Sequence, residues 1–295
     1  MLPRPGVRGS ADRGSSGPIT VATRRALWVL VFTTAAVAKK PPPFETRPPS
    51  PQAGKLIALT FDDGPKPYVL LGTALGSGVQ SKSLLRLLTE HRIKATFFVM
   101  GWRLSKNADA WCRRVDGGVC REAAEEEHRQ GDEIENHTYG HGDFRLMERR
   151  YGDAWILNDI DRASQVIQSI TGVRPHFVRP PDWDVWPALT RKIEARGYEV
   201  MTKSGAAPPK LRDVDSEDYL CAGKDVSRCP KPSDYDYVLR QIGKRENQGI
   251  DDHILAFHEL SQTVLTLARL IPVLKERGYH FVLLREYTGA VECRH

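Results

Sequence analysis

Two adjacent carboxylates stand where a hydrophobic run ends in a Gly-Pro. The hexapeptide TFDDGP occupies residues 60–65 and contains Asp62 and Asp63. Neighbouring like charges raise each other's pKa and cost stability unless a positive group lies beside them. Because Asp, Gly and Pro are common turn residues, a solvated turn explains the hexapeptide on its own equally well. A chemical role for the pair therefore depends on which other residues the fold brings to it.

Two histidines farther along the chain are spaced to bind one metal ion. The stretch NHTYGH (136–141) separates His137 from His141 by four positions, so on a helical turn both imidazoles would share one face. Catalytic zinc takes three protein ligands and leaves one position open for water. Asp63 would complete such a set, and Asp62 would then be free to take a proton from water. The histidine spacing alone does not establish a metal site.

Short hydrophobic runs alternate with amphipathic segments from residue 55 onward. The expected strands are 55–61, 94–100, 132–137, 176–179, 198–202, 253–258 and 280–284. The expected helices are 79–91, 119–130, 152–170, 185–196, 233–245 and 261–277. Such alternation is typical of βαβ units and predicts an α/β fold, either a barrel or a doubly wound sheet. No G-x-G-x-x-G follows the first strand, so the dinucleotide-binding fingerprint is missing.

Polar residues gather where the expected strands end. Asp62, Asp63, His137, Arg179 and His258 all fall at the carboxyl end of a strand. In (β/α) barrels this end of the strands carries the active site. The repetition of one pattern on four strands indicates an active site at that face.

Five short motifs now give a specific resemblance. TFDDGP, HTYGH, RPP (179–181), DSEDY (215–219) and ILAFHE (254–259) follow the order of the five motifs of the polysaccharide deacetylase family, carbohydrate esterase family 4. That family carries the NodB homology domain and includes chitin deacetylases, peptidoglycan deacetylases and some acetyl xylan esterases. ATFFVMG (95–101) and GDEIENHT (131–138) also resemble its framework. The resemblance covers about residues 53–290 and implies a distorted (β/α) barrel with seven or eight parallel strands.

The resemblance also implies roles for individual residues. Asp63, His137 and His141 would bind a divalent metal, zinc in most members, with Co²⁺ as an alternative. Asp62 would be the catalytic base, held by Arg179, and His258 the general acid. Asp215 would tune the pKa of His258, although Asp213 or Asp218 could take that role. Substrate would meet Asp182, whose backbone N–H could stabilise an oxyanion, and the aromatic residues Trp183 and Tyr219.

The departures from the family pattern cluster around the substrate. After RPP the family commonly continues Tyr-Gly, whereas this chain has Asp182-Trp183-Asp184. Tyr219 stands where the fourth motif normally ends in Trp, and Ala256 stands where Leu is frequent. Trp183 and Trp186 suit either the core or a stacking surface for sugar rings. We interpret these changes as altered specificity with the metal chemistry retained.

The first 52 residues have the composition of a leader and a spacer. Arg24 and Arg25 precede an apolar run at 26–38 that ends in small residues, which predicts a signal peptide over 1–38 with a long basic start. The run is short for a membrane span, so an uncleaved anchor is the less favoured alternative and no stable membrane insertion is expected. Residues 39–52 are a Pro-rich linker. The leader holds five arginines and one aspartate of a chain with net charge +6, so we do not expect nucleic acid as a partner.

The cysteines agree with export to an oxidising compartment. Cys112 and Cys120 are eight positions apart, as are Cys221 and Cys229, and Cys293 is left over. This spacing predicts two local disulfides in a secreted or extracellular protein, with cell-wall association as an option.

The expected activity is metal-dependent removal of N-acetyl groups from N-acetylglucosamine polymers such as chitin, with release of acetate, by a monomer. Two alternatives remain: an esterase for O-acetyl groups of xylan-type glycans, and a carbohydrate-binding relative without turnover. His253 fits no motif and is expected to be structural. Asn136 begins the sole N-x-Ser/Thr sequon, at NHT, and is expected to be unmodified because a glycan there would lie beside the metal.

Overall fold

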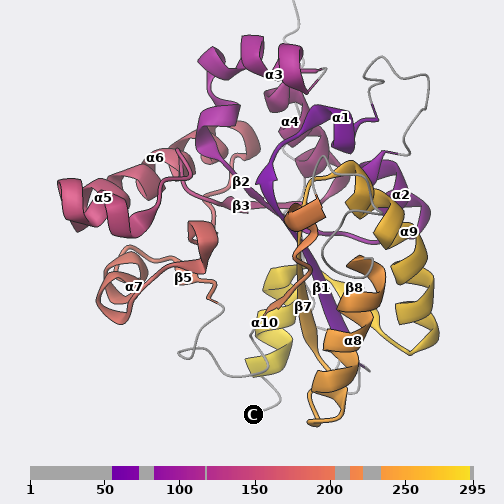
Figure 1. Cartoon of the computed structure of the whole chain (residues 1–295). Coiled ribbons are helices and arrows are strands. Elements are labelled where there is room, and N and C mark those ends of the chain that lie inside the picture. Colours follow the sequence, from indigo (N-terminus) through magenta and orange to yellow (C-terminus); the bar gives the residue numbers. More distant parts are fainter. Residues whose placement is uncertain (1–54, 73–82, 117, 203–212, 222–233, 293–295) are drawn as a thin grey trace, which may run out of the picture. The chain divides into compact units, whose positions relative to one another are not determined.

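The strand that carries the aspartate pair runs through the middle of the sheet (Figure 1). The computed structural model describes residues 55–72, 83–116, 118–202, 213–221 and 234–292, all in the unit that begins at Thr46. The strands are β1 (Leu56–Gly64), β2 (Thr96–Val99), β3 (Glu133–Asn136), β4 (Phe177–Val178), β5 (Glu199–Val200), β6 (Asp213–Asp215), β7 (His253–His258) and β8 (His280–Val282). The predicted leader, linker and helix start at 79–82 lie outside the described residues.

All strand pairs of the described sheet are parallel, in the order β5-β4-β3-β2-β1-β7-β6. β7 pairs with residues 57–62 of β1, while β8 and β2 pair with the beginning and the end of β1, respectively. No ladder joins β5 to β6 in the described part of the chain, so the barrel is open there. The expectation of a distorted (β/α) barrel is confirmed.

Most helices cover one face of the sheet, whereas the last helix packs against the opposite face, with Leu284 and Tyr287 beside Leu56. The α-helices are α1 (Pro67–Leu70), α2 (Leu84–Glu90), α3 (Asp109–Val115), α4 (Cys120–Gln130), α5 (Phe144–Tyr151), α6 (Asp153–Thr171), α7 (Pro187–Glu194), α8 (Asp234–Glu246), α9 (Ser261–Glu276) and α10 (Leu284–Glu292). The 3₁₀ turns described are η1 (Gly101–Leu104), η2 (Lys106–Ala108), η3 (Pro181–Trp183) and η5 (Asp218–Cys221). Figure 1 shows α5, α6 and α7 grouped beside the β3–β5 part of the sheet. No helix in the described ranges is long and apolar enough to cross a bilayer.

The core forms because β1 is apolar on both of its faces. Leu56 to Leu59 are almost completely buried, and Phe61 stacks on Phe97 with ring centroids 5.1 Å apart. Full burial of such side chains contributes about 1.5–3 kcal/mol each. The amphipathic helices supply the other side of this core, chiefly through leucines and isoleucines of α2 and α9.

The structure joins Cys112 of α3 to Cys120 of α4, as the spacing predicts. Both cysteines are fully buried beside Trp102 and Trp111. Cys229 and Cys293 lie outside the described residues, so the second pair stays a prediction.

The packing of α9 yields a test of the core. Leu267 is completely buried, whereas Leu265 on the same helix is 69% exposed. Leu267→Ala should lower the free energy of unfolding by about 2–5 kcal/mol because it leaves a cavity. Leu265→Ala should change it by less than about 0.5 kcal/mol. Urea unfolding of both variants measures this; equal losses would contradict the assigned orientation of the helix.

Candidate active site

The end of β1 lies beside the end of β7. Asp62 pairs directly with His258 in the parallel register, and Asp63 follows in the left-handed region with φ 67°. The next peptide bond, Gly64-Pro65, is cis. The two consecutive carboxylates have different surroundings. Asp62 is only 4% exposed, whereas Asp63 is partly buried in the cleft.

Arg179 holds the Asp62 carboxylate from the neighbouring part of the sheet. It follows β4 and is completely buried. Its Nη1 donates to Asp62 Oδ1 at 2.6 Å, and its Nη2 donates to Thr60 Oγ1 at 2.9 Å. The guanidinium also lies 4.0 Å from the ring centroid of Phe98. These contacts fix the orientation of Asp62, which agrees with the expected role of Arg179.

Asp63 and the two histidines meet at one point. His137 Nε2 and His141 Nε2 lie 3.4 Å and 3.2 Å from the same Asp63 oxygen, Oδ1. His137 Nδ1 is 2.8 Å from the carbonyl oxygen of Arg179. Because a carbonyl only accepts hydrogen bonds, Nδ1 carries the proton and Nε2 presents its lone pair to the cluster.

A tight loop, and not the helical turn expected from the spacing, brings the histidines together. Residues 137–141 contain no helix, and Thr138 and His141 have φ values of 66° and 52°. Asn136 Oδ1 accepts from the N–H of Thr138 at 2.6 Å, and Asp159 Oδ2 accepts from the N–H of Tyr139 at 2.9 Å. Side chains of β3 and α6 thus shape the loop. Asn136 is completely buried and its amide is bonded to α6, which agrees with an unmodified sequon.

The cluster suits a divalent transition metal. Its ligand atoms all lie within 4.8 Å of one another, and Asp63 Oδ1 is buried without a well-aligned hydrogen bond. Two imidazoles and one carboxylate are a common catalytic zinc set, and ligand atoms around tetrahedral zinc are about 3.3 Å apart. Burial opposes the charge on Asp63, but the contacts with His137 and His141 outweigh burial and lower its pKa below the usual range. Asp63, His137 and His141 would therefore hold such an ion.

His258 is bound by Asp218, and not by Asp215. Nδ1 of His258 lies 2.7 Å from Asp218 Oδ1, while Asp218 Oδ2 accepts from the His258 N–H at 2.8 Å and from Thr263 Oγ1 at 2.6 Å. Burial disfavours the charged imidazole, but Asp218, with smaller contributions from Asp62 and Asp63, raises the pKa of His258 to about 9.

The assignment of Asp215 as the partner of His258 is therefore corrected. Asp215 ends β6, and its carboxylate accepts from the N–H of Glu217 at 2.9 Å. This i to i+2 bond is an Asx turn, which the sequence DSEDY could have suggested. The turn carries the chain on to Asp218, one of the two alternatives; the side chain of Asp213 lies outside what the structure describes.

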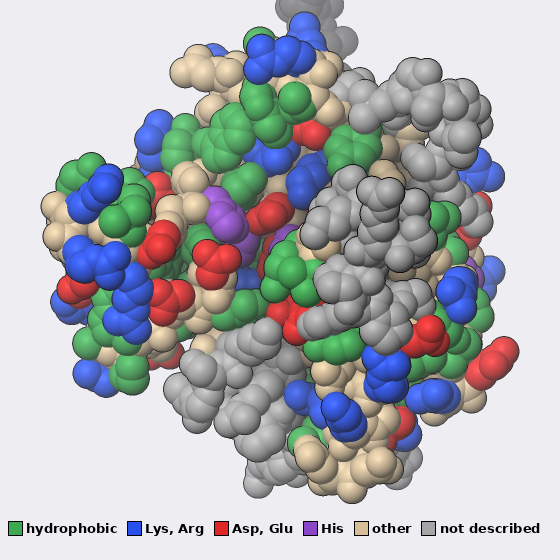
Figure 2. Space-filling model, in the orientation of Figure 1, with side chains coloured by type: hydrophobic (Ala, Val, Ile, Leu, Met, Phe, Trp, Pro, Cys, Tyr) green, Lys and Arg blue, Asp and Glu red, His purple; other side chains and the backbone are tan. Residues whose placement is uncertain are grey.

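All the predicted site residues except Arg179, which is buried beside Asp62, line a cleft of about 360 Å³. It is lined by Asp62, Asp63, His137, His141, Pro180, Asp182, Trp183, Asp215, Tyr219, Ala256 and His258. Tyr219 is half exposed, with its ring 5.3 Å from that of His258, and Trp183 packs partly against the core. Trp186 lies outside this lining and packs instead beside α7 and Arg145. Figure 2 shows histidine and acidic side chains together near the middle of the displayed face.

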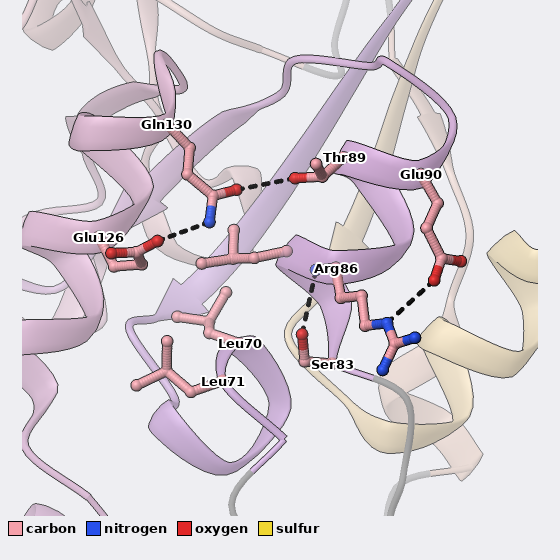
Figure 3. A pocket seen from close by; sticks show the side chains of 9 residues that line it. Leu70, Leu71, Ser83, Arg86, Thr89, Glu90, Glu126 and Gln130 are labelled. Atoms are coloured by element: carbon pink, nitrogen blue, oxygen red, sulfur yellow. Dashed lines mark hydrogen bonds and ion pairs between the residues drawn. The ribbon is translucent and has the colours of Figure 1, made fainter.

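A second hollow, of about 410 Å³, lies at α2 and α4 (Figure 3). Its polar side chains bond mainly to one another: Gln130 donates to Glu126 at 2.6 Å and accepts from Thr89 at 3.1 Å. Leu70 and Leu71 form part of its wall. No histidine is among the described residues that line this hollow.

Comparison with known proteins agrees with this geometry. The family model for polysaccharide deacetylases matches residues 50–204, slightly more than half of the chain. The chain belongs to the polysaccharide deacetylase family. A peptidoglycan-N-acetylglucosamine deacetylase of Bacillus cereus is 26% identical over 240 residues, which is 80% of this chain and 89% of that protein.

Other relatives extend the similarity across the family. A chitooligosaccharide deacetylase of Sinorhizobium fredii is 29% identical over 243 residues, covering 79% of this chain and 92% of that protein. The structure of a family 4 acetyl xylan esterase from Clostridium thermocellum, in complex with a cobalt ion, superimposes with a TM-score of 0.56. That similarity covers 79% of this chain and 90% of the other at 24% identity, and so shows a shared fold.

The His258–Asp218 contact predicts a pH dependence. Because the pKa of His258 is higher in the folded protein than the usual 6.5, its protonated form contributes stability that is complete below about pH 6.5 and is lost as the pH rises through about 9. In the metal-free protein, Asp218→Asn should lower this pKa from about 9 to 6.5 or below, and Asp215→Asn should leave it unchanged. NMR titration of the imidazole measures both; the reverse result would restore Asp215 as the partner.

The donor cluster predicts one tight metal site. His137→Gln should weaken zinc binding by at least about 100-fold because it removes a ligand with a fixed tautomer. His176→Gln is the matched control, since His176 is exposed and contacts Glu199 away from the cleft. Competition with a coloured chelator measures the affinity. Undiminished binding by His137→Gln would rule out the site.

Proposed function

We propose that this protein is a metal-dependent hydrolase that removes N-acetyl groups from N-acetylglucosamine polymers, chitin or a related glycan, and releases acetate. One observation supports this most strongly: Asp62 and His258 lie in the same cleft as the three candidate ligands Asp63, His137 and His141. Amide hydrolysis needs an electrophilic catalyst, a base and an acid. The described residues of this cleft can supply all three.

Asp62 is the proposed base. A bound divalent cation would supply Lewis acidity, polarising the amide carbonyl and lowering the pKa of a coordinated water. Asp62 takes a proton from the attacking water, and the 2.6 Å bond from Arg179 keeps its carboxylate aligned for this transfer. The arginine is completely buried, so no solvent competes for that bond.

His258 is the proposed acid. Its raised pKa keeps the imidazole protonated at neutral pH, ready to donate a proton to the departing amine. Asp218 orients the ring through Nδ1, which leaves Nε2 as the donating atom.

The turn at Asp182 is the proposed oxyanion contact. The N–H groups of Trp183 and Asp184 donate to Pro180 and Pro181, so the N–H of Asp182 is the candidate donor. One such donor stabilises the transition state by about 2.7–4 kcal/mol in enzymes where it has been removed by mutation.

The lining of the cleft favours an uncharged sugar. Among its described residues are four aspartates and neither lysine nor arginine. Asp182 and Asp215 add negative charge beyond the proposed base and ligand, which disfavours a sugar that carries a carboxylate. The relatives named for chitooligosaccharides and for the N-acetylglucosamine of peptidoglycan support the amide reaction. The acetyl xylan esterase supports the second candidate, O-acetyl hydrolysis with the same residues.

Zinc is the proposed metal because histidine nitrogens and a carboxylate suit it, and the cobalt ion bound to the acetyl xylan esterase supports Co²⁺ as an alternative. The predicted signal peptide supports secretion into the medium or to the cell wall, and we propose that the protein acts there as a monomer. Sequencing the amino terminus of protein recovered from culture medium checks the export; a terminus at Met1 would contradict cleavage.

Loss of the proposed base should abolish turnover without removing the metal. Asp62→Asn should lower acetate release from chitooligosaccharides by about 10²–10⁴-fold because the amide cannot take the proton. Zinc content measured on the same sample should stay near one per chain.

The substrate panel separates the candidates. Free amine and acetate released in equal amounts from chitooligosaccharides support the deacetylase, whereas acetate released only from acetylated xylan supports the esterase. Equal background rates for wild type and Asp62→Asn, with zinc bound in both, would contradict an enzyme and favour a carbohydrate-binding protein.

A further inference from the structure

Glu259 lies directly behind the turn that carries the aspartate pair. It follows His258 in the chain and is completely buried. Its Oε2 accepts a hydrogen bond from the backbone N–H of Lys66 at 2.6 Å. Its own N–H donates to the carbonyl oxygen of Asp62 at 3.4 Å. One residue is thus bonded to both sides of the turn at 62–66.

Gly64 is shaped to accept this carboxylate. A Cβ at position 64 would lie 1.6 Å from Glu259 Oε1, closer than any real contact allows. The carboxylate therefore occupies the space that a side chain at position 64 would need. Glu259 and Gly64 fit one another as a pair, immediately after Asp63.

The arrangement is costly for a group with only a structural role. Glu259 Oε1 is buried without a hydrogen-bond partner, and so are both carboxylate oxygens of Glu127, whose charge interacts with Glu259. A buried polar atom without a partner costs about 1–3 kcal/mol. Burial raises the pKa of Glu259 to about 7. A buried acid with an unpaired oxygen needs an explanation, and its bonds to both sides of the turn at 62–66 supply one.

We propose that Glu259 is a positioning residue that fixes Asp62 and Asp63 relative to His258. His258 is attached to Glu259 covalently, and the turn is attached through the Lys66 N–H, so the carboxylate sets the separation between acid, base and ligand. This inference rests on the proposed function for its catalytic part. Its effect on the metal ligand Asp63 does not depend on any turnover.

The chain contains a matched control at the other end of the same strands. Asp252 immediately precedes β7, as Glu259 immediately follows it. It is 7% exposed, and its Oδ1 accepts from the backbone N–H of Leu56, the first residue of β1, at 2.8 Å. Asp252 therefore bonds to the first residue of β1, and Glu259 bonds to Lys66, two residues after β1, at the end of the strands that carries the cleft.

The experiment compares Glu259→Leu, Glu259→Gln and Asp252→Leu for urea unfolding, zinc affinity by chelator competition, and kcat and KM on chitooligosaccharides. Glu259→Leu should weaken zinc binding by about 10–100-fold, as loss of a supporting residue does at other metal sites. Its kcat should fall by a similar factor, with KM within about 3-fold, because Asp62 loses its alignment. Glu259→Gln should keep both within about 3-fold, since its amide oxygen still accepts from Lys66. Asp252→Leu should lose stability and retain both functions.

Equal zinc affinity and kcat in Glu259→Leu and Asp252→Leu would overturn the inference and leave Glu259 a structural residue. If Glu259→Leu does not fold, Glu259→Asp and Gly64→Ala replace it. The first withdraws the carboxylate by one methylene and the second displaces it, so each should weaken zinc binding; unchanged affinity in both would also overturn the inference. Wild-type protein that binds zinc but releases no acetate from any substrate would contradict the proposed function alone.

Discussion

The parallel pairing of β1 with β7 is the constraint on which the candidate active site depends. It sets Asp62 directly opposite His258, so the proposed base and acid occupy adjacent strand ends. A slip of one residue in this register would turn every side chain of the strand to the other face. The dense burial of Leu56 to Phe61 makes such a slip very unfavourable. The same strand register therefore determines both the stability of the core and the geometry of the site.

The fold also explains how several carboxylates can lie close together in and beside the cleft. Each of the central carboxylates meets a nitrogen-bearing side chain from another element: Asp62 meets Arg179, Asp63 meets His137 and His141, and Asp218 meets His258. Asp63, His141 and Asp182 have positive φ values, a backbone conformation that costs energy and recurs at functional sites. The surrounding sheet and helices hold these conformations in place.

The sequence was sufficient to predict seven of the eight described strands and six of the ten described α-helices, because hydrophobic periodicity is a local signal. The order of the motifs was sufficient to predict that Asp63, His137 and His141 lie together. The sequence was insufficient for β6, which lies where no strand was expected, and for α10, since the run at 280–284 is a strand only to Val282. Asp218 was only an alternative partner of His258, because the Asx turn at Asp215 that brings Asp218 to the histidine is a feature of the folded backbone. Glu259 ended the fifth motif without an assigned role, since its bond to Lys66, 193 residues away, becomes visible only in the fold.

Direct observation of the metal tests the central claim. Crystals grown with zinc, with diffraction recorded on both sides of the zinc absorption edge, locate the ion without reference to activity. One peak is expected at about 2.0–2.2 Å from Asp63 Oδ1, His137 Nε2 and His141 Nε2, with Asp62 still bonded to Arg179. A peak bound by other residues, or no peak in the cleft at saturating zinc, would contradict that claim.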